Sequence, residues 1–299
     1  MATPPRLGPP RPVWEAGATL GEGPCWSQRD QALWWVDVLA STLHRWRPAD
    51  GERRRWTLPD TVSAVVERET APGLVLTLRR GFHTFDPGTG SLARLAEPEP
   101  ERTANRFNDG KCDAQGRFWA GSMDFACEAP TGAWYRLDPD GRCTRALDAG
   151  WPVTNGPTWS LDGRTMFAND TARRTVHAFA FDPAAGTLGA SREFLRFTKA
   201  DGFPDGMTTD AQGRLWIAHW GGACVTCHAP DDGRELARIA LPTDHVTSVA
   251  FGGPTLSTLF VTTAREGLSD TQRAGQPLAG ALFAVDTDTT GLAAARFGG

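Results

Sequence analysis

The sequence predicts an all-β protein, and specifically a six-bladed β-propeller with four-stranded blades around a central channel. The first observation is a repeat, because the turn glycines Gly116, Gly163 and Gly213 lie 47 and 50 residues apart. Repeats of roughly 40–50 residues with four short strands each are typical of propeller blades. The second is composition: 33 Gly, 22 Pro, 12 Trp and 15 Phe occur in strand and turn patterns, without amphipathic helical periodicity.

The repeat is clearest around two of these turns. The heptapeptide Asp-Ala-Gln-Gly-Arg-x-Trp occurs twice, beginning at Asp113 and at Asp210, and a looser copy runs Ser160–Arg164. Each copy predicts a strand, a tight turn at the glycine and a second strand that carries aromatic residues. Since the sheet of each blade is buried between two neighbours, abundant Trp and Phe on its strands agrees with a propeller.

Strand and turn signals divide the chain into six consecutive units. The units begin near Cys25, Ser63, Asn108, Asn155, Asp205 and Thr247. Each unit contains two further strand or turn signals. In order, these are Leu33–Asp37 and Pro48–Gly51; Gly73–Leu78 and Pro87–Gly90; Ala133–Leu137 and Asp138–Gly141; Thr175–Phe181 and Asp182–Gly186; Ala223–His228 and Pro230–Gly233; and Leu259–Thr262 and Gly280–Val285. Residues 1–12 are Pro-rich and are predicted to be a flexible lead. Residues 13–299 are predicted to form a single propeller domain, in which Val13–Leu20 closes the ring by pairing with strands near Leu282–Val285.

Charge and composition argue against several classes of partner. The formal net charge is -4 and the pI is about 5.9, so neither nucleic acid nor an anionic membrane is an expected partner. No apolar run approaches the roughly 20 residues of a membrane span. Met1–Pro12 lacks the hydrophobic region of a signal peptide, which favours a cytoplasmic protein whose six cysteines stay reduced. A monomer is the default expectation.

A polar position recurs five residues before the start of these turns. It is occupied by Glu22, Asn108, Asn155 and Asp205, and in the other two units by Ala64 or its neighbour and by a residue of Thr247–Val249. Because the innermost strand of each blade lines the channel of a propeller, we expect these side chains to meet at one mouth. Two carboxylates and two amides form an oxygen-ligand set that suits Ca²⁺, Mg²⁺ or Mn²⁺. The set contains no His or Cys, which argues against a tetrahedral structural zinc site.

The alternative interpretation is that these Asn and Asp residues only cap turns, as such residues beside Gly commonly do. Two features favour a metal site instead. The polar position keeps the same register in four repeats, and no turn requires the glutamate of Gly21-Glu22-Gly23-Pro24.

Six short motifs occur in a fixed order along the chain: Gly21–Pro24, Asn105–Lys111, Thr154–Pro157, Phe203–Gly206, Phe251–Gly253 and Thr262–Arg265. This set resembles the SMP-30/gluconolactonase/luciferin-regenerating family, which includes regucalcin and the bacterial sugar lactonases. The resemblance implies that Glu22, Asn155 and Asp205 bind a metal ion. It also implies that Arg106 and Asn108 face the substrate.

The activity that the resemblance implies is hydrolysis of a sugar lactone to an aldonic acid. A cation would polarise the lactone carbonyl, and Asp205 is the expected general base. Arg106 and Asn108 are expected to orient the sugar hydroxyls and to stabilise developing charge. One divalent ion is expected, Ca²⁺ first, with Zn²⁺, Mn²⁺ and Fe²⁺ as alternatives because carboxylate–amide sites accept several ions.

Two other functions stay open from the sequence. A phosphotriesterase-like hydrolase of the same fold would use the cation to polarise P=O. A non-catalytic calcium-binding or interaction propeller would need neither Arg106 nor a carboxylate at Asp205, and a propeller fold alone does not decide between these functions. Substrate preference is expected to depend on the loops Asp124–Pro130 and Glu266–Ala279.

Other motifs that resemble chemical sites are weaker. Cys224–His228 looks like half of a zinc or redox site, but the sequence holds no second pair, so Cys224 and Cys227 are predicted to be buried strand residues. His219 is predicted to be a packed residue. No Gly-x-Ser-x-Gly motif exists, which argues against a serine hydrolase of the α/β type.

Overall fold

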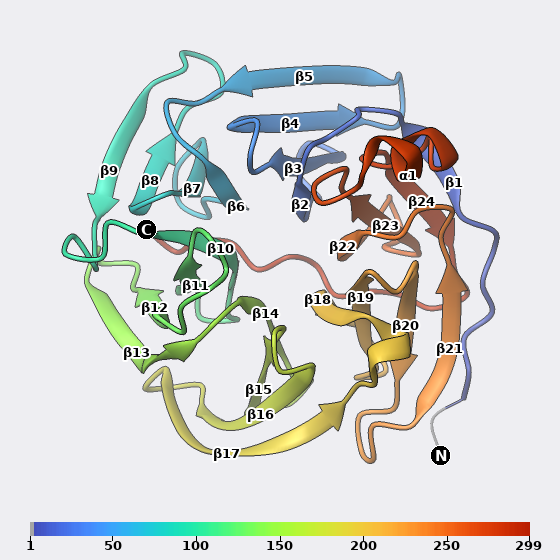
Figure 1. The fold of residues 1–299 in the computed structure, drawn as a ribbon. Helices are drawn as coiled ribbons and strands as arrows, with labels where there is room; N and C mark the ends of the chain where they lie inside the picture. Colours follow the sequence, from blue (N-terminus) through green and yellow to red (C-terminus); the bar gives the residue numbers. More distant parts are fainter. Residues whose placement is uncertain (1–2) are drawn as a thin grey trace.

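The computed structural model describes residues 3–299, with residue 149 by its backbone alone. Six four-stranded antiparallel sheets are arranged around a central axis, and Figure 1 looks along this axis. Each sheet is one blade, whose first strand lies nearest the centre and whose last strand lies on the outside (Figure 1). The fold is therefore the predicted six-bladed β-propeller.

In blades 1 to 5 the strand order follows the chain, whereas in blade 6 the N-terminal strand β1 is the outermost strand, after β22, β23 and β24. Blades 1 to 3 contain β2 (Gly21–Ser27), β3 (Ala32–Asp37), β4 (Thr42–Arg47) and β5 (Glu52–Thr57); β6 (Val62–Glu67), β7 (Leu74–Leu78), β8 (Gly81–Phe85) and β9 (Leu92–Ala96); and β10 (Asn105–Cys112), β11 (Phe118–Asp124), β12 (Gly132–Leu137) and β13 (Cys143–Trp151). Blades 4 to 6 contain β14 (Thr154–Trp159), β15 (Thr165–Asp170), β16 (Thr175–Asp182) and β17 (Thr187–Arg196); β18 (Phe203–Thr209), β19 (Leu215–Trp220), β20 (Cys224–His228) and β21 (Glu235–Ala240); and β22 (Val246–Gly252), β23 (Thr258–Thr263), β24 (Leu282–Asp286) and β1 (Arg11–Trp14). The helical segments are α1 (Asp270–Gly275) and a 3-10 turn at Lys199–Asp201. Over residues 3–299, neither of them has the length and apolar character that crossing a membrane requires.

The N-terminal strand closes the ring. β1 pairs antiparallel with β24, with Trp14 opposite Leu282, so the predicted partner of the closing strand is confirmed. The predicted strand Val13–Leu20 is wrong in its bounds, because the strand is Arg11–Trp14 and begins inside the segment predicted as a lead. The chain leaves the sheet soon after Trp14, and Gly17 takes a φ of 66° that extended backbone does not allow.

Burial follows the layers of each blade. Every residue of β3, β7 and β11 is buried, whereas most residues of the outer strands β5 and β9 are not. The inner layers lie between two neighbouring blades, so their strands lack the alternation of a half-exposed sheet. The largest fully buried side chains include four tryptophans: Trp35, Trp119, Trp134 and Trp216.

The repeated heptapeptide has a structural role. Asp113 Oδ2 accepts hydrogen bonds from Arg117 Nε at 2.6 Å and from Trp119 Nε1 at 2.8 Å. In the second copy, Asp210 accepts the equivalent two bonds at 2.7 and 2.9 Å. Each turn therefore ties the first strand of its blade to the second through one buried carboxylate.

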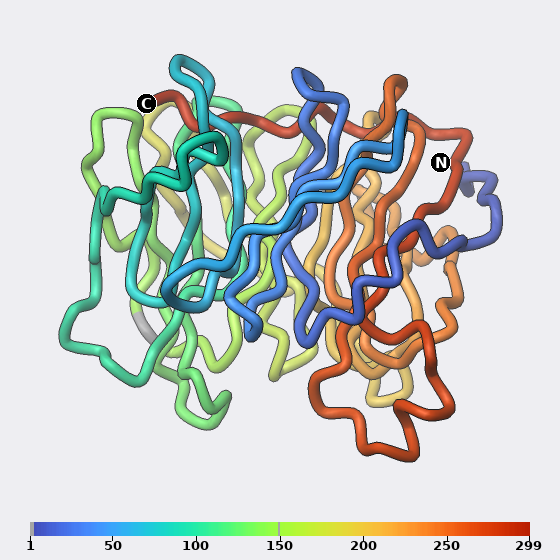
Figure 2. The backbone as a smooth tube through the Cα atoms, turned by 90° about the horizontal axis from the view of Figure 1, so that it is seen from above, coloured from blue at the N-terminus to red at the C-terminus, as the bar shows by residue number. Residues whose placement is uncertain are grey.

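The two ends of the ring differ. Residues 287–299 cross one end, and the backbone of Phe297 pairs there with Glu67 and Glu69 of blade 2 at 2.8 Å. Figure 2 shows this C-terminal segment along one end and the segment that contains α1 projecting from the other. The second end is therefore free of the C-terminal segment.

Candidate active site

The six inner strands are interrupted at equivalent positions. The register of each inner strand against its neighbour shifts between Glu22 and Cys25, Val62 and Ala64, Phe107 and Gly110, Asn155 and Thr158, Pro204 and Met207, and Val246 and Ser248. A bulge leaves a residue unpaired and redirects the side chains beside it. The four predicted polar positions all lie at or beside such a bulge. In blades 2 and 6 the unpaired residues are Ser63 and Thr247, which resolves the register that the sequence left open.

The bulges bring the five predicted site residues together. Arg106 Nη1 donates to Asn108 Oδ1 at 2.6 Å, and Asn108 Nδ2 donates to Asn155 Oδ1 at 2.9 Å. Glu22 and Asp205 lie close enough that the charge of one raises the pKa of the other, and both interact with the charge of Arg106. All five residues are at most 9% exposed. They come from blades 1, 3, 4 and 5.

Hydrogen bonds fix the amide of Asn155. Its Nδ2 donates to Thr171 Oγ1 at 2.9 Å, and that hydroxyl donates to the carbonyl oxygen of Pro204 at 2.7 Å. Asn108 Nδ2 also donates to the carbonyl oxygen of Thr154 at 2.7 Å. A carbonyl oxygen has two lone pairs, so Asn155 Oδ1 retains one beyond the bond from Asn108.

A third carboxylate, Asp109, joins the site and was not predicted. Asp109 Oδ1 accepts from Gly110 N at 2.7 Å, and Asp109 Oδ2 accepts from Gly156 N at 2.9 Å, which ties the bulge of blade 3 to that of blade 4. Lys111 was also missed, and it donates from blade 3 to the carbonyl oxygen of Met207 in blade 5. Both residues lie in the motif Asn105–Lys111, which the sequence analysis singled out. They were missed because only Asn108 of this motif occupies the polar position that recurs in the other repeats.

The three carboxylates share a buried and negatively charged space. Burial, and then the charge of Asp109, raise the pKa of Glu22 to about 8. Burial also raises the pKa of Asp109, to about 6. The pKa of Asp205 is raised well above its usual value by burial and then by the charges of Glu22 and Asp109. Over residues 3–299, no basic nitrogen lies within 4.0 Å of these carboxylates.

This donor set fits a hard divalent cation. Carboxylate oxygens of Glu22 and Asp205 and the amide oxygen of Asn155 are ligands that Ca²⁺ and similar ions accept. A cation among them would offset the buried negative charge that raises both pKa values. In the part of the chain that the structure describes, no three His, Cys, Asp or Glu side chains form a metal-binding group, so such a site depends on the amide of Asn155.

Without metal, the protein is expected to lose stability as the pH rises from about 4.5 to about 8. The pKa of Glu22 is 4.5 in its unperturbed state and about 8 in the folded protein, so the folded protein binds more protons than the unfolded chain over this range. Stability falls with pH wherever the folded state holds more protons. We expect the Tm in EDTA to fall by several degrees across this range, as measured by circular dichroism.

Excess Ca²⁺ is expected to remove most of that fall in Tm, because a ligand that binds only the folded state stabilises it. The variant Glu22→Gln cannot ionise, and its Tm in EDTA should change less with pH. A wild-type Tm in EDTA that rises from pH 4.5 to pH 8 would contradict the assignment of Glu22.

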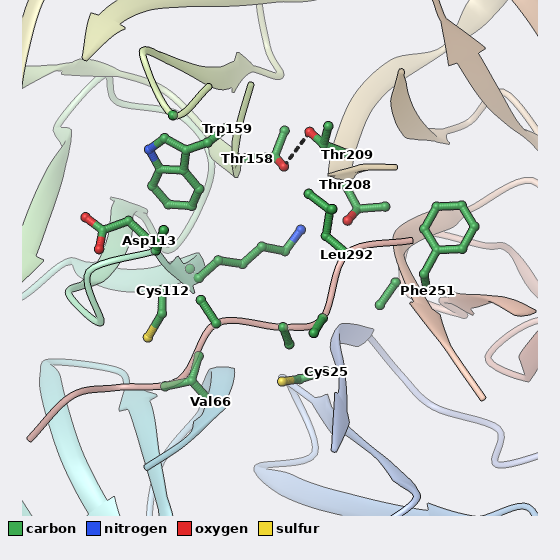
Figure 3. Close-up of a pocket in the computed structure, with 18 of the residues that line it drawn as sticks. Cys25, Val66, Cys112, Asp113, Thr158, Trp159, Thr208, Thr209, Phe251 and Leu292 are labelled. Atoms are coloured by element: carbon green, nitrogen blue, oxygen red, sulfur yellow. Dashed lines mark hydrogen bonds between the residues drawn. The ribbon is translucent and has the colours of Figure 1, made fainter. Parts of the chain in front are cut away.

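A cavity of about 460 Å³ lies at the other end of the channel. Figure 3 shows Cys25 and Trp159 from the inner strands and Leu292 from the C-terminal segment in its lining. The five predicted site residues are not among the described residues that line it. Its acidic residues Asp113 and Asp162 are engaged in turn hydrogen bonds, so it has no equivalent of the carboxylate cluster. The chemistry of the side chains therefore favours the opposite mouth as the active site.

Both loops that were predicted to set substrate preference lie at the mouth with the carboxylates. Asp124–Pro130 directly follows β11, and the ring of its Phe125 lies 5.7 Å from the guanidinium carbon of Arg106. The loop Glu266–Ala279 carries α1, which projects from the same end (Figure 2). No residue of Asp124–Pro130 was predicted as a site residue, because the loop lies outside the repeated unit.

The weaker motifs have structural roles. Cys224 and Cys227 are 2% and 0% exposed in β20, as predicted. His219 is fully buried, and its Nε2 lies 2.7 Å from Thr226 Oγ1, which agrees with the predicted packing role.

Fold and site together define a propeller with acidic and amide side chains gathered at one mouth of its channel. The model of the SMP-30/gluconolactonase/LRE-like region matches residues 20–265 of the chain. The protein therefore belongs to this family.

Individual relatives extend over nearly the whole chain. The protein is 36% identical over 283 residues to L-arabinolactonase of Azospirillum brasilense, covering 94% of this chain and 93% of that protein. It is also 36% identical over 284 residues to 6-deoxy-6-sulfogluconolactonase of Pseudomonas putida, covering 94% and 96%. The solved structure of the calcium-binding protein regucalcin of Agrobacterium tumefaciens aligns with a TM-score of 0.92 at 30% identity, covering 99% of both chains.

Proposed function

We propose that this protein is a metal-dependent lactonase that hydrolyses aldonolactones to aldonic acids. The observation that carries the proposal is the convergence of Glu22, Asn155 and Asp205 at the mouth where Arg106 and Asn108 also lie. Relatives at 36% identity are named L-arabinolactonase and 6-deoxy-6-sulfogluconolactonase, which supports a sugar lactone as the substrate class.

Glu22, Asn155 and Asp205 are the residues that would hold the divalent cation, and Ca²⁺ is the proposed ion. When bound, the cation polarises the lactone carbonyl and stabilises the negative charge that develops on its oxygen. The charge of Arg106 offsets the buried carboxylates only in part, because the pKa values of Glu22 and Asp205 are still raised, and this supports a cation between them.

Asp205 is the proposed general base. Asp205 is buried at the mouth beside Glu22, so one of its carboxylate oxygens would bind the cation and the other would accept a proton from water. It takes a proton from water as the water oxygen attacks the carbonyl carbon. The ester C–O bond of the ring then breaks, and the leaving ring oxygen takes up that proton to become a hydroxyl of the aldonic acid.

Arg106 and Asn108 orient the substrate in this proposal. The Arg106 guanidinium is held by its bonds to Asn108 Oδ1 at 2.6 Å and to the carbonyl oxygen of Phe107 at 3.0 Å. Its remaining donors are available to the ring hydroxyls of a sugar lactone. Because these contacts exist before and during the reaction, they contribute mainly to substrate binding.

The variant Arg106→Ala is expected to raise KM for an aldonolactone by about 10- to 100-fold, with a smaller change in kcat, because it removes hydrogen bonds of a charged group to the substrate. Steady-state kinetics measure this split. Arg54→Ala, which removes an exposed arginine on β5, is the matched control and should match the wild type. If kcat falls and KM stays constant, Arg106 acts in the transition state instead.

The function is tested with a panel of 1,4- and 1,5-aldonolactones and one phosphotriester, assayed with EDTA and after addition of Ca²⁺, Mn²⁺ or Zn²⁺. We expect lactone hydrolysis that EDTA abolishes and added metal restores. Phosphotriester hydrolysis that exceeds lactone hydrolysis would favour the phosphotriesterase-like alternative. Metal binding without hydrolysis of either substrate would favour a non-catalytic propeller.

A further inference from the structure

Phe125 is the first residue after β11, and the backbone fixes its position at the mouth. Its backbone nitrogen donates to the carbonyl oxygen of Ala104 at 2.9 Å. The preceding carboxylate, Asp124 Oδ2, accepts from Glu128 N at 3.0 Å and from Ala129 N at 3.1 Å. These bonds hold the start of the loop against blade 3, so the fold sets where the Phe125 side chain leaves the backbone.

Two guanidinium groups lie beside the ring of Phe125. The guanidinium carbon of Arg79 lies 5.1 Å from the ring centroid, and that of Arg106 lies 5.7 Å from it. Within residues 3–299, the buried Nε atoms of both arginines have no hydrogen-bond partner. Cations within about 6 Å of an aromatic face are attracted to it. The ring therefore supplies an interaction that helps to hold Arg106 in place.

Much of the ring stays open to solvent. Phe125 is 38% exposed, and among residues 3–299 the other large exposed apolar side chains are Leu95, Leu161 and Leu292. Of the four, Leu161 and Leu292 line the cavity at the far end of the channel, whereas Phe125 contacts a site residue. A cyclic polyol presents C–H groups on one face and hydroxyls at its edge. The exposed ring can therefore pack against the C–H face while the neighbouring guanidinium donates hydrogen bonds to the hydroxyls.

We propose that Phe125 is a further substrate-orienting residue, which holds the Arg106 guanidinium and packs its exposed surface against the C–H face of a sugar lactone. This inference rests on the proposed lactonase function. It assigns a substrate contact to the loop Asp124–Pro130, which lies outside the repeat. The cation site is not involved, so the effect is on substrate binding.

The test compares Phe125→Ala, Phe125→Leu and Phe125→Tyr with the wild type on one aldonolactone. Phe125→Ala and Phe125→Leu are expected to raise KM by about 3- to 10-fold with kcat within about twofold, because they lose the aromatic face. Phe125→Tyr keeps the ring and should restore the wild-type KM. Leu161→Ala, an exposed apolar residue at the far end, is the matched control and should leave KM unchanged.

A second readout separates substrate contact from a change in the fold. Binding of 1,5-anhydroglucitol, a cyclic polyol without a carbonyl, is measured by calorimetry and should weaken by the same factor in Phe125→Ala and Phe125→Leu. The Tm of each variant should stay within a few degrees of the wild type. A wild-type KM in Phe125→Ala, while the wild type hydrolyses lactones, would overturn this inference alone. No lactone hydrolysis by the wild type would overturn the proposed function and, with it, this inference.

Discussion

The variant Asp205→Asn is expected to lower kcat for aldonolactone hydrolysis by at least about 1000-fold, because it removes both the general base and a proposed metal ligand. Asparagine has nearly the volume of aspartate, so packing around the bulge of β18 should be preserved. The substitution also removes a carboxyl group whose pKa is raised well above its usual value by burial. The Tm of the metal-free variant should therefore equal or exceed that of the metal-free wild type at neutral pH.

Kinetics and thermal unfolding on the same preparations check this prediction. Asp286→Asn changes an exposed carboxylate at the end of β24, and it is expected to leave both kcat and Tm unchanged. The increase in Tm that Ca²⁺ gives to the wild type should be largely lost in Asp205→Asn. Normal lactone turnover by Asp205→Asn would refute both roles of this residue.

The variant Asp210→Ala is expected to lower the free energy of unfolding by about 3–5 kcal/mol, because it leaves a buried guanidinium without its partner. Asp210 is fully buried, and its Oδ2 accepts from Arg214 Nε at 2.7 Å and from Trp216 Nε1 at 2.9 Å. Arg214 itself is only 5% exposed, so water cannot easily replace the carboxylate.

Urea denaturation followed by tryptophan fluorescence measures this loss. The matched control is Asp162→Ala in the looser copy of the repeat, where the carboxylate is exposed and accepts from Ser160 Oγ and Arg164 N. We expect the control to change the free energy of unfolding by about 1 kcal/mol or less. Equal losses in the two variants would show that the buried ion pair does not decide the stability of the blade.

The fold was predictable because its signals are local and repeated. Asp113 and Asp210 each bond to an arginine four residues later and to a tryptophan six residues later, so one heptapeptide specifies one hairpin. Two copies of this heptapeptide, a looser third copy and six consecutive strand-and-turn units are explained by few folds other than a propeller. The bounds of the closing strand were less predictable, since pairing with β24 depends on a segment about 270 residues away and not on local sequence.

The candidate site was predictable in part. Glu22, Asn108, Asn155 and Asp205 keep one register within the repeat, and that register places each of them at or beside a bulge of an inner strand. Phe125 has no such signal, because its contact with a site residue comes from a loop that no other blade repeats.

The sequence by itself determined the strands, the turns and which polar positions recur, because those features depend on contacts within a few residues of chain. Only the tertiary structure decided that Asn108 reaches Asn155 and that Asp109 reaches Gly156, in each case across 47 residues. It also decided that three carboxylates share one buried space, where burial raises the pKa of each and a neighbouring carboxylate adds to the shift for Glu22 and Asp205. The physical reason is that the distance between blades is set by the packing of all six around the axis, and electrostatic interaction in the channel depends on that distance.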